Sequence, residues 1–257
     1  MSDGKDRPAG DQAGYAVHLE RLKVQPDTPE RSYESASMHE LLLRYQRFRD
    51  EIFPARKEEF LKLAGEQTPQ VLFITCSDSR VAPDVIFQSE PGDLFVCRNV
   101  GNIIPPYGEM LGSTSAAIEF AVRVLQVKAI VICGHSDCGA MKALMHPEQV
   151  AELPTVSAWL RHSEPARQIA TEYYSDLSED EFLAALTEEN IVAQISNLET
   201  HPSVASRLRR GDLEIYGWVY KIHSGEVWGL DAKQGRFVAL DSSLPSATRP
   251  PRRRAAT

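Results

Sequence analysis

VLFITCSDSR, residues 71–80, joins a compact apolar run to a cysteine and a short polar segment. A run of this length, rich in Val, Ile and Phe, is typical of a strand buried on both faces of a parallel sheet. Two further runs of this kind lie at Leu94 to Arg98 and Ala129 to Cys133. Helical patterns at Pro83 to Ser89 and Ser113 to Gln126 separate the three runs. This order of strand, helix and strand predicts an α/β fold with right-handed crossovers.

The C-terminal half is predicted to complete the sheet after a long helical region. Helical patterns occupy most of the segment from Val156 to Leu208. Leu213 to Tyr220 then returns to a strand pattern, and a Ser-Gly turn at 224–225 leads into Val227 to Leu230, as in a β-hairpin. The predicted fold is therefore a mostly parallel β-sheet flanked by helices, with a C-terminal antiparallel hairpin.

The segment before the first strand is predicted to be a helical arm. Apolar residues recur at intervals of three and four from Met38 to Ile52, which predicts an amphipathic helix. Pro54 suits the first turn of a second helix that runs to about Ala64.

The two ends of the chain differ from its middle in composition. Residues 1–35 lack hydrophobic periodicity and are predicted to form a disordered arm, whereas residues 245–257 carry four arginines among prolines and are predicted to form a disordered basic tail. The catalytic domain is therefore assigned to residues 36–244.

Composition and charge exclude several classes of protein. The chain has 257 residues, of which 42% are apolar, so it can bury a sizeable core. Lys and Arg total 28 against 36 for Asp and Glu, and this net charge of -8 argues against a binder of nucleic acid or anionic membranes. No apolar stretch approaches the roughly 20 residues that cross a bilayer, and no signal-peptide core is found near the N-terminus. We expect a cytoplasmic protein with no nucleic-acid or membrane partner.

Two cysteines and a histidine follow the predicted strands. Cys76 comes directly after the first strand, and His135 and Cys138 come after a later one. Open α/β sheets bind ligands at the carboxyl ends of their strands, so we expect these three side chains to meet. Two thiolates and an imidazole suit zinc and leave the fourth tetrahedral position to water, as in catalytic zinc sites. A structural zinc site, which would normally have a fourth Cys or His, is the alternative.

Four segments in this order resemble those of β-class carbonic anhydrases: Cys76 to Arg80, Pro91 to Asp93, Arg98 to Asn102 and Gly134 to Gly139. The similarity covers roughly Leu41 to Leu240. It implies reversible hydration of carbon dioxide to bicarbonate and a proton by hydroxide bound to zinc. It also implies an obligate homodimer that often assembles further.

The resemblance assigns roles to residues beside the ligands. Asp78 and Arg80 are the expected catalytic pair, in which the arginine keeps the carboxylate ionised and the carboxylate orients the nucleophile. Substrate binding is assigned to four residues: Gln67, Phe95, Val100 and Gly139. Gln67 is expected to act in the site of a second subunit. Phe73 stands where members that close their site typically carry Trp, so the resemblance is closer to the plant-type, open-site subclass.

A phosphatase, a scaffold protein and a carbon disulfide hydrolase are the alternatives to a carbonic anhydrase. A cysteine-dependent phosphatase would place an arginine six positions after its cysteine, whereas residue 82 is Ala82. A scaffold protein with a structural zinc is a second alternative, and a protein partner of the tails is left open. Related enzymes hydrolyse carbon disulfide with the same zinc ligands, so assays with carbon dioxide and carbon disulfide are needed to separate these activities.

Smaller expectations concern side chains away from the ligands. The helix at residues 113–126 is expected to present Phe120, Ala121 and Val124 on one apolar side. Cys97 and Cys133 lie within predicted strands and are expected to be buried thiols without a catalytic role. The histidines without ligand-like partners are expected at the surface or at helix ends: His146, His162, His201 and His223.

Overall fold

This computed structural model describes residues 37–109 and 112–240. The predicted disordered arm and basic tail lie outside these described residues, so both stay predictions. The chain divides into two compact units, one ending at Lys57 and one beginning at Glu58. The assignment of catalysis to residues 36–244 likewise stays a prediction.

The first unit is helical. It contains α2 (Met38–Arg47), a π-helical turn η1 (Phe48–Ile52) and α3 (Phe53–Ala55), and α4 (Lys57–Leu63) follows at the boundary. Because the Phe53 N–H donates to the Phe48 carbonyl five residues back, the widened turn accommodates Pro54 without a break. Pro54 lies in the first turn of α3, as expected, but α3 ends at Ala55, before Arg56 with φ of -115°. The expected single helix to about Ala64 is therefore divided, because α4 forms the part up to Leu63.

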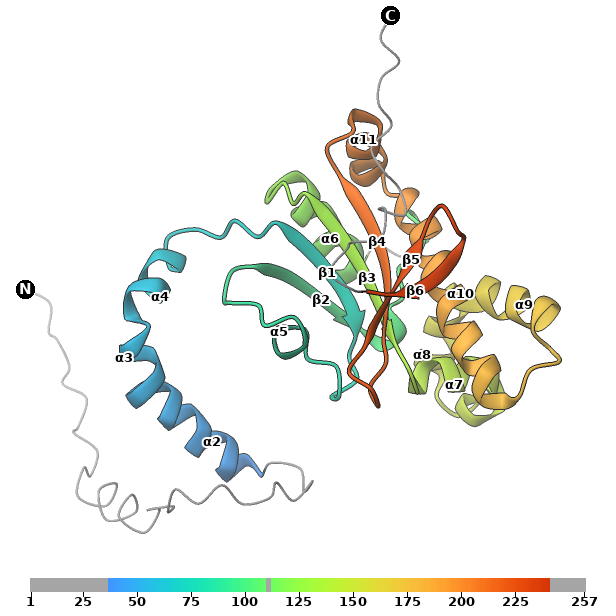
Figure 1. Cartoon of the computed structure of the whole chain (residues 1–257), viewed down its shortest axis with the longest axis horizontal. Coiled ribbons are helices and arrows are strands. Elements are labelled where there is room, and N and C mark those ends of the chain that lie inside the picture. Colours follow the sequence, from blue (N-terminus) through green and yellow to red (C-terminus); the bar gives the residue numbers. More distant parts are fainter. Residues whose placement is uncertain (1–36, 110–111, 241–257) are drawn as a thin grey trace, which may run out of the picture. The chain divides into compact units, whose positions relative to one another are not determined.

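The second unit is built on a sheet that has the order β2-β1-β3-β4-β5-β6 within the described residues (Figure 1). Its strands are β1 (Val71–Cys76), β2 (Leu94–Asn99), β3 (Ala129–His135), β4 (Glu214–Tyr220), β5 (Val227–Asp231) and β6 (Arg236–Ala239). The first four pair in parallel, and the last two pair antiparallel. The predicted fold class, a mostly parallel sheet finished by an antiparallel hairpin, is confirmed.

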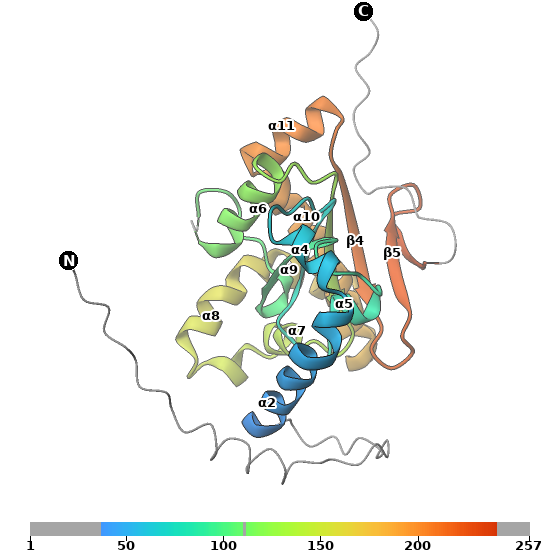
Figure 2. The ribbon, with the colours of Figure 1, turned by 90° about the vertical axis from the view of Figure 1, so that its left-hand side faces the viewer.

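Helices fill the connections between these strands. They are α5 (Pro83–Ile86), α6 (Ser113–Arg123), α7 (Gly139–Met145), α8 (Pro154–Leu160), α9 (Glu164–Tyr173), α10 (Glu179–Glu199) and α11 (Pro202–Arg210). Figure 2 shows α6 and α8 on one side of the ribbon and β4 and β5 on the other. Within the described ranges, no helix combines the length and apolar character needed to cross a bilayer.

Two apolar clusters cover the two faces of the sheet. On one face, Ile118 of α6 and Ile191 of α10 join Ile74 and Ile132 in a continuous core. On the opposite face, Phe73 contacts the rings of Phe87 and Trp218. Burial of apolar side chains on both faces stabilises the central strands and fixes where their ends lie.

Two expectations about burial are wrong. β2 is an edge strand in this chain, and Val96 in its middle is 37% exposed, so it is not buried on both faces. The buried face of α6 carries Ile118, Ala121 and Val122, whereas Phe120 is 41% exposed. The helix is rotated by about one position from the expected side because α11 and the sheet flank it together.

Gly217 of β4 allows α10 to pack directly on the sheet. A Cβ atom at this position would lie 2.6 Å from Cγ2 of Ile191 and 3.0 Å from Cδ1 of Ile195. We therefore expect Gly217→Ala to lower the free energy of unfolding by about 1–3 kcal/mol in a denaturant titration. The matched control is Gly65→Ala, whose Cβ would meet only a carbonyl oxygen at 3.8 Å. Equal stability of the two variants would contradict this packing argument.

Candidate metal centre

The two cysteines and the histidine converge at the carboxyl edge of the sheet. Cys76 ends β1 and His135 ends the neighbouring parallel strand β3, while Cys138 directly precedes α7. The two sulfurs are 4.0 Å apart, and the ligand atoms of all three residues lie within 4.8 Å of one another. All three side chains are buried. The expected meeting of these residues is confirmed, and the group can hold a metal ion.

The geometry of the group fits a tetrahedral metal ion. Zinc–sulfur bonds of about 2.3 Å place two thiolates about 3.8 Å apart, close to the distance found. His135 Nδ1 lies 2.9 Å from the Ser136 carbonyl oxygen, so it carries the proton and Nε2 offers its lone pair. Nε2 is buried and has no hydrogen-bond partner in the described residues. A buried acceptor normally has a partner, and a metal ion bound between Nε2 and the two sulfurs would supply it.

The two thiols differ in acidity. The hydrogen bond from Cys138 lowers the pKa of Cys76, while the same contact and burial raise the pKa of Cys138. The Gly101 N–H also donates to the Cys76 sulfur, over 3.4 Å. Gly101 has φ of 79°, and a Cβ there would lie 2.9 Å from Cβ of Ala140, so a larger residue would disturb this donor. Cys76 is thereby prepared as a thiolate.

Asp78 and Arg80 form a bidentate pair beside the ligands. Arg80 donates from Nε to Asp78 Oδ1 over 3.0 Å and from Nη2 to Oδ2 over 2.8 Å. The Arg80 backbone N–H adds a third bond to Oδ1. These donors lower the pKa of Asp78 to about 2, so the carboxylate is ionised at neutral pH. Its Oδ2 lies 3.8 Å from His135 Nε2, next to the position that a metal would take.

The sequence did not show which side chains hold the loops of this site in place. Arg98 on β2 donates to the carbonyl oxygens of Cys76, Asp78 and Val81, which fixes the turn after β1. Asn190 on α10 donates to the Gly101 carbonyl. The amide side chains on the apolar helix α10 were the one signal in the sequence, because buried amides usually form hydrogen bonds to the backbone of a neighbouring loop.

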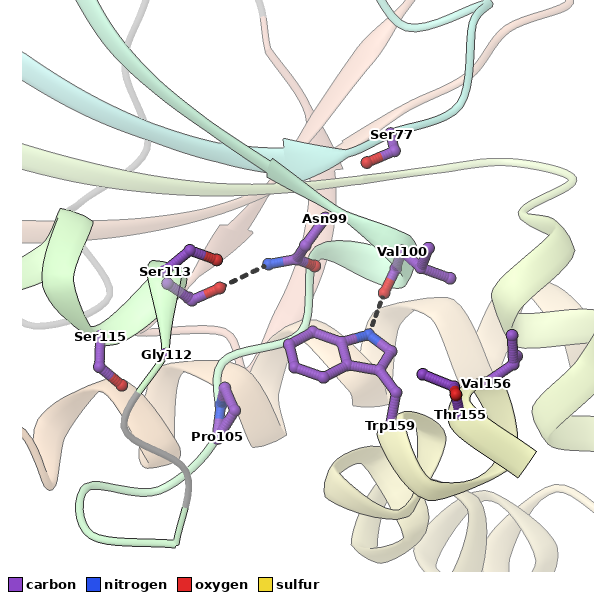
Figure 3. Close-up of a pocket in the computed structure, with 11 residues that line it drawn as sticks. Ser77, Asn99, Val100, Pro105, Gly112, Ser113, Ser115, Thr155, Val156 and Trp159 are labelled. Atoms are coloured by element: carbon purple, nitrogen blue, oxygen red, sulfur yellow. Dashed lines mark hydrogen bonds between the residues drawn. The ribbon is translucent and has the colours of Figure 1, made fainter. Parts of the chain in front are cut away.

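A cavity of about 430 Å³ lies at the carboxyl ends of β1 and β2 (Figure 3). Its lining includes Ser77, which follows Cys76, and Val100, whose carbonyl accepts a hydrogen bond of 2.7 Å from Trp159 Nε1. Pro105 and Val156 add apolar surface. A mainly apolar wall at these strand ends suits a small substrate without charge.

The other predicted substrate residues are placed differently. Gly139 is the first residue of α7, directly after Cys138. Phe95 lies opposite Leu72 in the sheet, and its ring contacts that of Phe120. It is four positions, or about 13 Å, from the carboxyl end of β2. Gln67 is exposed and lies before β1, whereas Cys76 is at the other end of this strand, which is about 17 Å long. One chain therefore does not bring Gln67 and Phe95 to its own metal group.

The remaining cysteines and one histidine differ in burial. Cys133 is buried, and burial raises its pKa to about 12, so it stays a thiol. Cys97 is only half-buried, against expectation, because β2 is an edge strand. His201 directly precedes α11, as expected for a helix end, but it is 3% exposed and bonds to the Pro105 carbonyl, so it has a structural partner in the core.

An α/β fold with a buried Cys-His-Cys group at its strand ends places three side chains where they can hold a metal ion. The carbonic anhydrase family model matches residues 71–227. A carbonic anhydrase of Pseudomonas aeruginosa is 48% identical over 203 residues, which cover 79% of this chain and 92% of that protein. A carbonic anhydrase of Synechocystis is 46% identical over 208 residues, covering 80% and 76%. The chain belongs to the carbonic anhydrase family, and the enzymes that it resembles in structure are of the β-class.

Solved structures agree with this assignment. The β-carbonic anhydrase CcaA superposes with a TM-score of 0.79 at 44% identity, over 82% of this chain and 95% of that chain. A β-carbonic anhydrase of Sordaria macrospora, described as tetrameric, gives a TM-score of 0.68 at 32% identity, over 78% and 98%. The family, the enzyme class and the fold are therefore established together.

Proposed function

We propose that this enzyme binds zinc through Cys76, His135 and Cys138 and catalyses the reversible hydration of carbon dioxide to bicarbonate and a proton. The observation that carries the proposal is the unpaired, buried Nε2 of His135 facing two sulfurs that are already 4.0 Å apart. Within the described residues the group has three members, which leaves a fourth tetrahedral position free. A structural zinc site with four protein ligands has no support in this arrangement.

Each residue around the group then has a separate task. When bound, zinc lowers the pKa of a water molecule toward about 7 and supplies a hydroxide nucleophile at neutral pH. Asp78, kept ionised by its two hydrogen bonds from Arg80, would accept a hydrogen bond from the nucleophile and so orient it toward the substrate. Val100 and the apolar cavity wall hold carbon dioxide, and Gly139 positions it through its backbone N–H. The proton released with bicarbonate passes to solvent.

Gln67 and Phe95 are proposed to complete the site of a second copy of the chain. Their distance from the ligands of their own chain supports a homodimer or a higher homo-oligomer with shared sites. The intact pairing of Asp78 with Arg80 supports the open, plant-type subclass. A cytoplasmic location stays a prediction from the sequence.

The test of the proposed function is stopped-flow carbon dioxide hydration, with the zinc content measured on the same sample. We expect one zinc per chain and activity that disappears when a chelator removes the metal. Activity without stoichiometric zinc would contradict the mechanism. Carbon disulfide is assayed in parallel, and faster turnover of carbon disulfide than of carbon dioxide would reassign the substrate.

The N-terminal helices are expected to be needed for assembly. No residue of α2 is buried, and four of its apolar side chains are exposed: Met38, Leu41, Leu42 and Tyr45. Such a stripe is usually covered by a partner. Deleting residues 1–35 should preserve the oligomer, and deleting residues 1–64 should destroy both assembly and activity, as measured by light scattering and hydration assay. A fully active monomer after the larger deletion would refute shared sites.

A further inference from the structure

Arg80 is held by a second carboxylate in addition to Asp78. Its Nη1 donates to Asp137 Oδ2 over 2.7 Å, and its Nη2 donates to the Asp137 carbonyl oxygen over 3.0 Å. Because Nε and Nη2 are also bonded to Asp78, every nitrogen of the guanidinium has a carboxylate or carbonyl partner. The catalytic pair is thus part of a three-residue arrangement.

Asp137 is fixed in an unusual conformation to make these contacts. It lies between two predicted metal ligands, His135 and Cys138, and has φ of 59°, a region that residues other than Gly rarely adopt. Its second carboxylate oxygen forms an ion pair with Lys142, one turn along α7. Both Asp137 oxygens are therefore paired with cations, although the side chain is half exposed.

From this geometry we infer that Asp137 is a positioning residue: it keeps Arg80 on Asp78 and thereby keeps the Asp78 carboxylate from binding the metal as a fourth protein ligand. The inference rests on the proposed zinc site. Asp78 Oδ2 is already 3.8 Å from His135 Nε2, and a carboxylate released from its arginine so near a divalent cation would bind it at about 2.0–2.2 Å. The metal and Arg80 compete for the same oxygens, and Asp137 favours Arg80.

Arg80 has room to leave if Asp137 is lost. A second cavity, of about 510 Å³, is bordered by Arg80, Asp137 and Lys221. The Arg80 side chain is 44% exposed, so burial does not lock it in place and its ion pairs must do so. A surface ion pair alone contributes little, whereas a planar guanidinium held at both edges has a defined orientation.

The test compares zinc-loaded crystals of the wild-type protein and Asp137→Asn at pH 7. Asn keeps the size of the side chain and tolerates the positive φ while removing the charge. In the wild type we expect Asp78 paired with Arg80. In Asp137→Asn we expect Arg80 turned away, an Asp78 oxygen at about 2.0 Å from zinc, and kcat/KM for hydration reduced about tenfold or more. Asp176→Asn is the matched control, since Asp176 is an exposed carboxylate between α9 and α10. This variant should keep both the Asp78–Arg80 pair and the wild-type kcat/KM.

The outcomes separate this inference from the proposed function. An Asp137→Asn crystal that retains the Asp78–Arg80 pair, whatever its activity, would overturn the positioning role. A wild-type protein that carries zinc but does not hydrate carbon dioxide would instead refute the proposed function, while the two crystal structures would still decide the role of Asp137. If Asp137→Asn does not fold, Asp137→Gly adopts the same φ without strain and takes its place.

Discussion

Cys76→Ser, His135→Ala and Cys138→Ser are each expected to lose the metal and essentially all hydration activity. The three ligand atoms lie within 4.8 Å of one another, so removal of one leaves two ligands for an ion that needs three from the protein. Loss of an outer partner of a metal ligand typically costs about 10–100-fold, and we expect loss of a ligand itself to reduce kcat/KM by about 1,000-fold or more. Zinc content and stopped-flow hydration are measured on the same preparations.

Cys133→Ser is the matched control for these substitutions. Cys133 is buried in β3, two residues before His135, yet its sulfur donates to the Gly134 carbonyl and does not belong to the metal group. The variant should retain one zinc per chain and most of its activity, with some loss of stability from a buried hydroxyl. If Cys133→Ser lost its zinc while Cys138→Ser kept it, the assigned thiolate would be wrong.

Asp78→Asn is expected to lower kcat/KM by about 100-fold or more without loss of zinc. The amide can still occupy the same space, but its nitrogen can present N–H donors to Arg80 and to the nucleophile, where the carboxylate presents only acceptors. The nucleophile then loses the acceptor that orients it. The measurement is kcat/KM at fixed pH, with zinc content determined by metal analysis.

Asp231→Asn provides the control for that change. Asp231 is the last residue of β5, before the turn to β6. Like Asp78, it accepts a hydrogen bond from the backbone N–H two residues later, but it is not part of the Cys-His-Cys site. Its replacement tests the cost of losing such a turn carboxylate away from the metal group, and activity should be unchanged. A zinc-loaded Asp78→Asn protein with at least half of wild-type activity would remove Asp78 from the mechanism.

The meeting of the three proposed metal ligands could be predicted from sequence because their signals are local. Cys76, His135 and Cys138 each follow a compact apolar run, and parallel strands place their carboxyl ends at one edge whatever the details of packing. The same reasoning gave the order of strands and helices and the hairpin from β4 to β5. Residue type and spacing were enough to single out this group because few sets of side chains suit a metal ion.

Which side of a helix is buried and which strand lies at the edge depended on neighbours distant in sequence. Phe120 was expected with the buried Ala121 but is 41% exposed, because α11 and the sheet together select the face of α6. β2 resembled a central strand, yet no strand pairs with its outer edge in the described residues. Periodicity reports that an apolar side exists and not which surface will cover it.

The sequence by itself determined which two cysteines and histidine meet, the class of fold and the place of this group at the strand ends. Only the tertiary structure decided how these ligands are held: Arg98 ties the turn after β1, Asn190 holds the Gly101 loop, and Asp137 reaches Arg80 from 57 positions away. Ligand identity follows from side-chain chemistry that is written along the chain. Orientation follows from hydrogen bonds between segments that meet only after the strands pair, because donors and acceptors must come within about 3 Å of each other.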